Sequence, residues 1–357
     1  MAVMPVAAGR ESSYFICNGS VWVTGSNSKG KLGVGDDHIF CHKPVQLDIE
    51  SNIISVAAGT DFCLLLDEYG RVYKFGTIYM LETTVYYPEM LENLPTIMAI
   101  FAAMDGFFLL DAEDKIWICG RNSYGGLGKP VGLHHCQMKK LKHLREIQQI
   151  SAGEFHTLFL NNAGQVWSCG DAQNGKLGQG SMQGRERYML PQIIPDIPPM
   201  SMVSAGRSHS MFLDVDGRVW LCGWNFWRDK NNLELDRPEM VEEISRIALI
   251  HAANVACFAV DECGVVYQLG SSFNLNKGTS GKQFLPVKHF ANINHIASSE
   301  THILFVDAVG TVWSFGDNVS GQLAMGHCQP VGVPQEVSTL PSPVGRSIVT
   351  IKSARNV

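Results

Sequence analysis

The sequence predicts an all-β protein, a single seven-bladed β-propeller of four-stranded antiparallel blades. The first observation is a repeat, because close variants of one aromatic motif, Gly-x-Val-Trp-x-x-Gly, occur seven times in the 357 residues. The second is spacing, since the glycines that close successive copies lie 44 to 53 residues apart, a period typical of solenoids and propellers. The third is that short β-rich segments with hairpin punctuation fill the intervals.

The aromatic motif carries most of the tryptophan in the chain. Five of the seven tryptophans occupy its fourth position, and tyrosine occupies that position in the other two copies. Because the copies extend over the whole length, we expect residues 1–357 to form one propeller domain. The copies are residues 19–25, 70–76, 114–120, 164–170, 217–223, 264–270 and 310–316.

Each repeat is expected to build one blade from elements in a fixed order. An alternating run that ends in Ala-Gly comes first, as in residues 203–206, and a second apolar run follows, as in residues 211–213. An acidic or Asn turn with glycine, as in residues 214–217, then leads into the aromatic motif. Such turns supply the positive φ of a tight hairpin. Four short strands in roughly 50 residues make a propeller blade.

A second motif, Asn-x-x-Gly-x-Leu-Gly, follows the closing glycine in the best-formed copies, and we call it the loop motif. It occupies residues 27–33 and 122–128, and variants occupy residues 172–178 and 318–324. With Ala-Gly-x-x-His and the aromatic motif in the same register, the chain resembles the regulator of chromosome condensation repeat family. The resemblance covers nearly the whole chain and implies a seven-bladed β-propeller.

The two ends of the chain are expected to close the ring. Residues 6–9 and 13–17 have the pattern of the Ala-Gly strand and the strand after it, which the copy starting at Gly310 lacks downstream. We therefore predict that residues 1–17 complete the last blade, so that N- and C-terminal strands close the ring and leave no open sheet edge. Residues 348–354 look like one more Ala-Gly strand, either redundant or a sign that the chain is a piece of something longer.

Composition excludes several classes of protein. A net charge of −6 and a pI near 6.0 argue against a general nucleic-acid or anionic-membrane surface. No apolar run approaches the roughly 18 residues that span a bilayer, and the N-terminus lacks the pattern of a signal peptide. The ten cysteines include no Cys-x-x-Cys pair and are interpreted as buried apolar groups in a reducing compartment. We expect a cytoplasmic or nuclear protein.

Histidine invites a metal hypothesis that we set aside. His156, His209 and His302 occupy one repeat position, and we interpret them as buried side chains that bond backbone across the contact between blades. His134, His135 and Cys136 are adjacent, and neighbours on a strand point to opposite faces. No catalytic constellation or phosphate-binding loop stands out. We therefore expect no catalytic residues, no metal and no cofactor.

The fifth repeat departs from the loop motif, and its departure is the main candidate for partner binding. Residues 224–232 contain both tryptophans outside the aromatic motif, and Trp and Arg dominate the energetics of protein interfaces. The alternative is that the aromatics fill space left by missing glycine turns. The candidates here are Trp224, Phe226, Trp227 and Arg228.

Two further segments are secondary candidates. Residues 77–87 replace the loop motif in the second repeat and include Tyr79 and Tyr86. Residues 138–145 form the densest basic run and include Lys139 and Lys140. This run is either a solvated outer strand or a docking patch for an acidic partner.

The resemblance implies a binding function rather than bond-making chemistry. The founding member of the family is a guanine nucleotide exchange factor for the small GTPase Ran, and it acts through a wedge-shaped loop. Residues 217–223 followed by 225–232 look similar to that wedge, which suggests roles for Arg228, Asp229 and Asn231. Our leading hypothesis is a monomeric, non-catalytic propeller that recognises a partner protein through blade-end loops, as a regulatory or scaffolding module. The alternative is an exchange factor for a Ran-like small GTPase.

Overall fold

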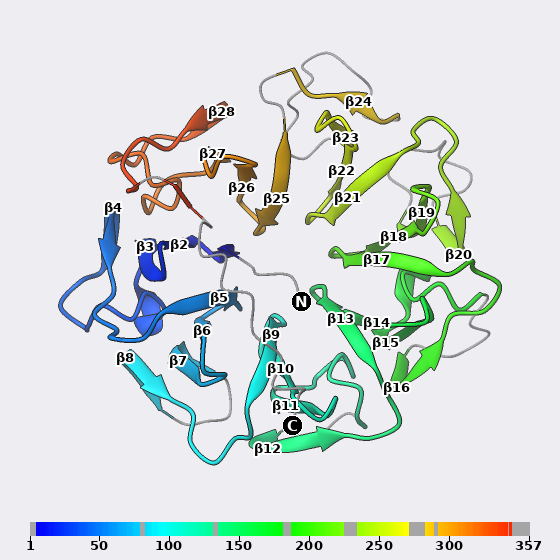
Figure 1. The fold of residues 1–357 in the computed structure, drawn as a ribbon, viewed down its shortest axis with the longest axis horizontal. Helices are drawn as coiled ribbons and strands as arrows, with labels where there is room; N and C mark the ends of the chain where they lie inside the picture. Colours follow the sequence, from blue (N-terminus) through cyan, green and yellow to red (C-terminus); the bar gives the residue numbers. More distant parts are fainter. Residues whose placement is uncertain are drawn as a thin grey trace, which may run out of the picture.

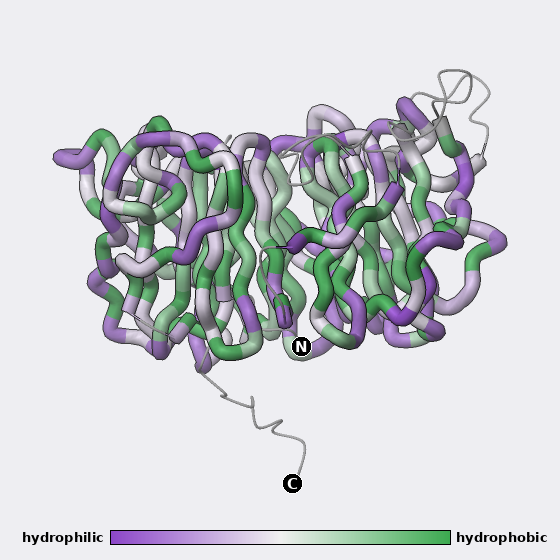
Figure 2. Tube along the Cα trace, turned by 90° about the horizontal axis from the view of Figure 1, so that it is seen from above, coloured by the Kyte–Doolittle hydropathy of each residue, from purple (hydrophilic) through white to green (hydrophobic). Residues whose placement is uncertain are grey.

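The chain forms a ring of seven four-stranded antiparallel sheets around a central axis (Figure 1), which confirms the predicted seven-bladed propeller. The structure is a computed structural model, and it describes residues 5–78, 83–130, 135–180, 187–224, 234–270, 283–288, 292–341 and 343–344. Seen from the side, the ring is a flat disc whose strands run between its two faces (Figure 2). No helix in these ranges has the length and hydrophobicity of a membrane-spanning segment.

Every blade uses its four strands in chain order, from the centre of the ring to its outer wall (Figure 1). The first blade is β1 (Val6–Gly9), β2 (Ser12–Cys17), β3 (Ser20–Ser26) and β4 (Phe40–Gln46). The second is β5 (Ile53–Ala58), β6 (Phe62–Asp67), β7 (Val72–Thr77) and β8 (Thr84–Met90). The third is β9 (Ile97–Ala102), β10 (Gly106–Asp111), β11 (Ile116–Gly120) and β12 (His135–Leu141). The fourth is β13 (Ile147–Ala152), β14 (His156–Asn161), β15 (Val166–Asp171) and β16 (Arg187–Ile193).

The remaining three blades repeat the same plan. The fifth is β17 (Met200–Ala205), β18 (His209–Asp214), β19 (Val219–Trp224) and β20 (Glu234–Met240). The sixth is β21 (Ile247–Ala252), β22 (Ala256–Asp261), β23 (Val266–Gly270) and β24 (Leu285–Pro286). The seventh is β25 (Ile293–Ser298), β26 (His302–Asp307), β27 (Val312–Gly316) and β28 (Val331–Glu336). The aromatic motif is thus the third strand of its blade.

The prediction that residues 1–17 complete the last blade is wrong. Strands β1 and β2 pair with β3 in the first blade, and the last blade has four strands of its own. The physical reason is local. Asn18 and Gly19 both have positive φ, 50° and 81°, so a two-residue hairpin joins β2 directly to β3, and the pairing closes a very short loop.

Side-chain packing closes the ring instead. Val6 and Phe15 of the first blade share one buried cluster with Leu304 and Val306 of the last. Backbone contacts also join the two ends. A strand-like bridge pairs Cys17 with Val344, and the N–H of Gly326 donates to the carbonyl of His42 on β4 at 3.1 Å. A buried cluster of the same kind fills each interface between neighbouring blades.

An aspartate organises the hairpin that precedes the aromatic motif. In the fifth blade, Oδ1 of Asp214 accepts from the backbone N–H groups of Asp216 at 3.0 Å and Arg218 at 2.9 Å. Its Oδ2 accepts from Nε1 of Trp220 at 3.0 Å. The turn and the aromatic residue at the fourth position of the motif therefore form one hydrogen-bonded unit. The same pairing joins Asp67 to Tyr73, Asp111 to Trp117 and Asp261 to Tyr267.

The loop motif fastens each loop to the next blade. Oδ1 of Asn27 accepts from the backbone N–H of Leu32 at 3.0 Å, and its Nδ2 donates to the carbonyl of Gly35 at 2.7 Å. Leu32 is buried between the blades. Gly35 N–H then donates to the carbonyl of Tyr86 on the outer strand of the second blade, at 2.9 Å. Asn122 and Asn318 hold their loops in the same way.

The described cysteines behave as the sequence predicts. They are free thiols, and most of them are buried. Burial raises the pKa of the Cys17 thiol to about 12, and it raises the pKa of the Cys169 and Cys222 thiols as well. Protonated thiols of this kind act as small apolar side chains in the core.

Candidate functional site

One face of the ring carries two sets of loops, and we call it the cavity face. Because the four strands of a blade alternate in direction, the turn after the first strand and the loop after the third emerge on the same side. Backbone bonds join the two sets, as from Asp171 N–H to the carbonyl of Phe155 at 2.9 Å and from Trp224 N–H to the carbonyl of Ser208 at 2.7 Å. The hairpins that contain Asp214 and its equivalents lie on the opposite face.

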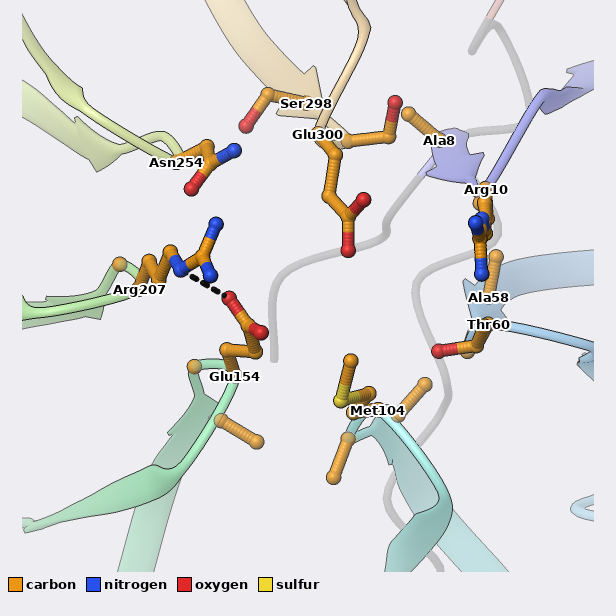
Figure 3. A pocket seen from close by; sticks show the side chains of 18 of the residues that line it. Ala8, Arg10, Ala58, Thr60, Met104, Glu154, Arg207, Asn254, Ser298 and Glu300 are labelled. Atoms are coloured by element: carbon orange, nitrogen blue, oxygen red, sulfur yellow. Dashed lines mark ion pairs between the residues drawn. The ribbon is translucent and has the colours of Figure 1, made fainter. Parts of the chain in front are cut away.

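A cavity of about 170 Å³ lies at the centre of the cavity face (Figure 3). Each blade contributes three consecutive residues to it, namely two small residues at the end of its first strand and one further residue. The small residues let the blades meet, because a Cβ atom on Gly153 would lie 2.1 Å from the carbonyl oxygen of Gly206. The further residue differs from blade to blade. In chain order these residues are Arg10, Thr60, Met104, Glu154, Arg207, Asn254 and Glu300.

The cavity carries charges of both signs. Nε of Arg207 lies 2.9 Å from Oε2 of Glu154, and Glu300 projects into the opening beside them (Figure 3). Burial raises the pKa of the Glu154 carboxyl, the charge of Arg207 opposes this rise, and the charge of Glu300 adds to it. Mixed charges beside Met104 suit recognition of a polar protein surface.

The recurrent histidines hold neighbouring blades together. Nε2 of His156 lies 2.7 Å from Oγ of Ser210, and Nε2 of His302 lies 2.7 Å from Oγ of Ser13. Burial lowers the pKa of His302 to about 3, so its ring is neutral. These contacts support the structural interpretation. The partner of His156 and His302 is a serine hydroxyl, whereas His209 bonds the backbone of Ala256 in the next blade, as predicted. No group of three His, Cys, Asp or Glu side chains within the described ranges could hold a metal ion.

The predicted partner-binding residues that the structure describes lie on three different blades. Trp224 ends β19 on the cavity face and is 39% exposed. Tyr86 lies on β8 of the second blade and is exposed, and Lys139 and Lys140 lie exposed on β12 of the third. The remaining candidates fall outside the described residues, namely Tyr79, Phe226, Trp227, Arg228, Asp229 and Asn231.

The residues of the cavity were missed at the level of sequence. Each belongs to a short turn with no motif of its own, and only the ring brings the seven turns together. A signal was present, since every one of them follows the small pair that ends the first strand of a blade. Alignment of the seven repeats on that pair would have found the cavity positions.

Comparison with known families identifies the repeat. The pattern described as Regulator of chromosome condensation (RCC1) repeat matches residues 18–66, 113–160, 163–213 and 309–356, more than half of the chain. A second pattern of the same description matches residues 147–176.

Curated relatives carry the repeat in proteins of different size. Regulator of chromosome condensation from Xenopus laevis is 22% identical over 360 residues, which cover 92% of this chain and 74% of that protein. E3 ubiquitin-protein ligase HERC2 from Homo sapiens is 26% identical over 300 residues, which cover 77% of this chain and only 6% of the ligase.

Solved structures share the fold. Human WBSCR16 superposes with a TM-score of 0.80 at 17% identity, covering 89% of this chain and 94% of that one. Yeast RCC1 (Prp20), solved bound to Kap60, superposes with a TM-score of 0.78 at 17% identity, covering 89% of this chain and 83% of that one. Likeness at this level of identity concerns the architecture alone.

Proposed function

This chain belongs to the regulator of chromosome condensation (RCC1) repeat family, and from that premise we propose that it is a non-catalytic, protein-binding propeller. It acts as a monomeric regulatory or scaffolding module in the cytoplasm or nucleus, and its partner covers the cavity face. Yeast Prp20, which shares the fold, is described bound to Kap60 and with binding properties to Gsp1p and histones. These partners belong to Prp20, but they favour protein binding as the function of this chain.

The contrast between fixed and variable positions carries the proposal. The small pair at the end of each first strand keeps the blades in register, whereas the residue after it changes charge, size and polarity around the ring. A rigid scaffold that presents variable side chains from short turns is the usual arrangement of a recognition surface. Trp224 adds a partly exposed indole on the same face, and buried tryptophans are frequent anchors of interfaces.

Affinity capture tests this proposal. The intact propeller is immobilised beside two variants, Glu300→Lys with Trp224→Ala on the cavity face and Val309→Ser in the hairpin on the opposite face, where Val309 is 60% exposed. We expect the cavity-face variant to weaken capture of the main partner by at least about tenfold and the control to retain it. Equal capture by both variants would remove the cavity face from the proposal.

The second candidate function is guanine nucleotide exchange on a Ran-like small GTPase. The observation that favours it is the similarity of residues 217–232 to the exchange wedge of the family. The assay is release of labelled GDP from a purified GTPase. An exchange factor accelerates release, and Trp227→Ala with Arg228→Ala slows the stimulated rate without altering the intrinsic rate. A scaffold captures its partner and leaves GDP release unchanged.

A further inference from the structure

A second cavity lies on the outer wall, where the third blade meets the fourth, and we call it the rim groove. It has a volume of about 410 Å³, within the roughly 300–1,000 Å³ of ligand pockets. Its lining comes from the end of the loop motif, from the segment that leaves β12, and from β15 and β16. These are residues 128–130, 140–144, 167 and 190–192.

Lysines dominate the charge of the rim groove. Lys129, Lys140 and Lys142 line it, and none of the three makes an ion pair with a carboxylate of the described chain. Burial lowers the pKa of Lys129, and the charges of Lys139 and Lys142 lower it further, so these cations repel one another. This happens in a chain whose net charge is −6. A local excess of unpaired cations on an acidic protein favours an anionic partner.

The groove also has an apolar floor. Trp167 reaches the groove from β15, and Leu141 and Leu144 lie buried beside it. Leu190 on β16 also lines the groove and is 50% exposed. One lysine is held over an indole, because Nζ of Lys140 lies 4.4 Å from the ring centroid of Trp117, a cation–π arrangement. The groove therefore offers an apolar seat with fixed positive charge around it.

We propose that the rim groove binds an extended acidic peptide segment of a partner protein. One apolar side chain of the peptide sits between Trp167 and Leu190, and carboxylates on either side of it face Lys129, Lys140 and Lys142. The size of the cavity fits a side chain with its neighbours rather than a folded domain. The concave floor disfavours a flat lipid surface, and the net charge of the chain disfavours nucleic acid. This binding site is separate from the cavity face.

Fluorescence anisotropy with defined probes tests the proposal on the intact chain. The first probe is a short dye-labelled peptide with Asp and Glu residues on both sides of a single Phe. The second probe has Ser in place of Phe. We expect saturable binding of the first probe, binding about fivefold weaker for the second, and loss of affinity as salt screens the lysines.

Variants with matched controls locate the binding. Lys129→Glu with Lys142→Glu is expected to weaken the affinity for the first probe by about tenfold or more. Lys43→Glu, on the outer strand of the first blade, should leave that affinity unchanged. Leu190→Ser weakens binding several-fold, whereas Ile193→Ser on the same strand, outside the lining, does not. Melting temperatures confirm that each variant is folded, and Lys129→Gln with Lys142→Gln replaces the charge reversal if it fails to fold.

Three results would overturn the proposal. One is no saturable binding at peptide concentrations up to about 1 mM, and another is equal affinity for the wild type and the folded lysine variants. The third is preferential binding to vesicles of anionic phosphatidylserine with the same dependence on lysine, which would make the patch a membrane surface. The cavity-face variant Glu300→Lys with Trp224→Ala should bind the peptide normally, so failure at one surface is distinguishable from failure at the other.

Discussion

Nε2 of His302 in the last blade lies 2.7 Å from Oγ of Ser13 in the first blade, although 289 residues separate them in the chain. The Ser13 hydroxyl donates its single proton to the carbonyl of Gln322 at 2.7 Å, so the ring of His302 must donate from Nε2. His156 and Ser210 form the same pair inside the ring, 54 residues apart. The boundary between the chain ends is therefore built like an internal one.

The first prediction concerns this closing contact. Ser13→Ala leaves the Nε2–H of His302 buried without its acceptor, and we expect the free energy of unfolding to fall by about 1–3 kcal/mol. Ser210→Ala should lower the free energy of unfolding by a similar amount, because it breaks the equivalent pair. Urea denaturation of both variants measures the losses. A negligible loss at Ser13 beside a clear loss at Ser210 would mean that the ends are not joined in this way.

The second prediction concerns acid. Burial lowers the pKa of His251 and His209 to about 4, whereas both titrate near 6.5 when unfolded. The unfolded chain therefore binds more protons between these values, and stability falls as the pH falls, by up to about 1.4 kcal/mol per pH unit for each group.

Urea midpoints measured from neutral to acidic pH test the prediction. The variant His251→Gln removes one titrating group, and its stability should decline less steeply than that of the wild type. Identical slopes for the two proteins over this range would contradict the assigned burial of His251.

The third prediction concerns the hairpin aspartate. Asp214→Ala removes the acceptor for two turn amides, Trp220 and Arg218, and should cost about 3 kcal/mol or more. Asp214→Asn should cost about 1–2 kcal/mol, because the fourth blade shows that an amide suffices for the turn. There Oδ1 of Asn161 accepts from the N–H groups of Ala163 at 3.1 Å and Gln165 at 2.9 Å. Equal losses in thermal or urea unfolding would show that the turn amides are not the main contribution.

The fourth prediction concerns two tryptophans. From sequence, Trp167 is expected to be buried between blades, but the structure leaves it half-buried, against the core between the third and fourth blades. Trp167→Ala should therefore cost about 1–3 kcal/mol, less than the roughly 3–5 kcal/mol of a fully buried aromatic. Trp224→Ala should stay within about 1 kcal/mol. A large destabilisation at Trp224 would make it part of the core and not of a binding surface.

Much of the fold could be predicted because the number of motif copies in the sequence gives the number of blades. Seven aromatic motifs predicted seven blades. The acidic or Asn turns with glycine predicted the hairpin that precedes each aromatic motif. It was harder to predict where each blade begins in the sequence. Because the repeats follow one another around a ring, the sequence pattern alone allows the Ala-Gly strand to share a blade with the aromatic motif before it or with the one after it. The Asn18-Gly19 turn was the local signal that β2 pairs with β3.

Less of the candidate sites could be predicted, because both are assembled from distant segments. The basic run pointed to Lys139 and Lys140, of which Lys140 lines the rim groove, but part of the apolar floor comes from Trp167 and Leu190 of the next repeat. The partner of His302 is Ser13, near the other end of the chain. Contacts of this kind depend on ring closure and are visible only in three dimensions.

Hydrogen–deuterium exchange on the complex with the captured partner tests the central claim most directly. If the partner covers the cavity face, protection should appear in the turns that line the central cavity, such as residues 206–209, 253–256 and 299–302. The hairpins of the opposite face, such as residues 214–217 and 307–310, should exchange as in the free protein. Protection confined to those hairpins, with unchanged exchange around the cavity, would contradict the account.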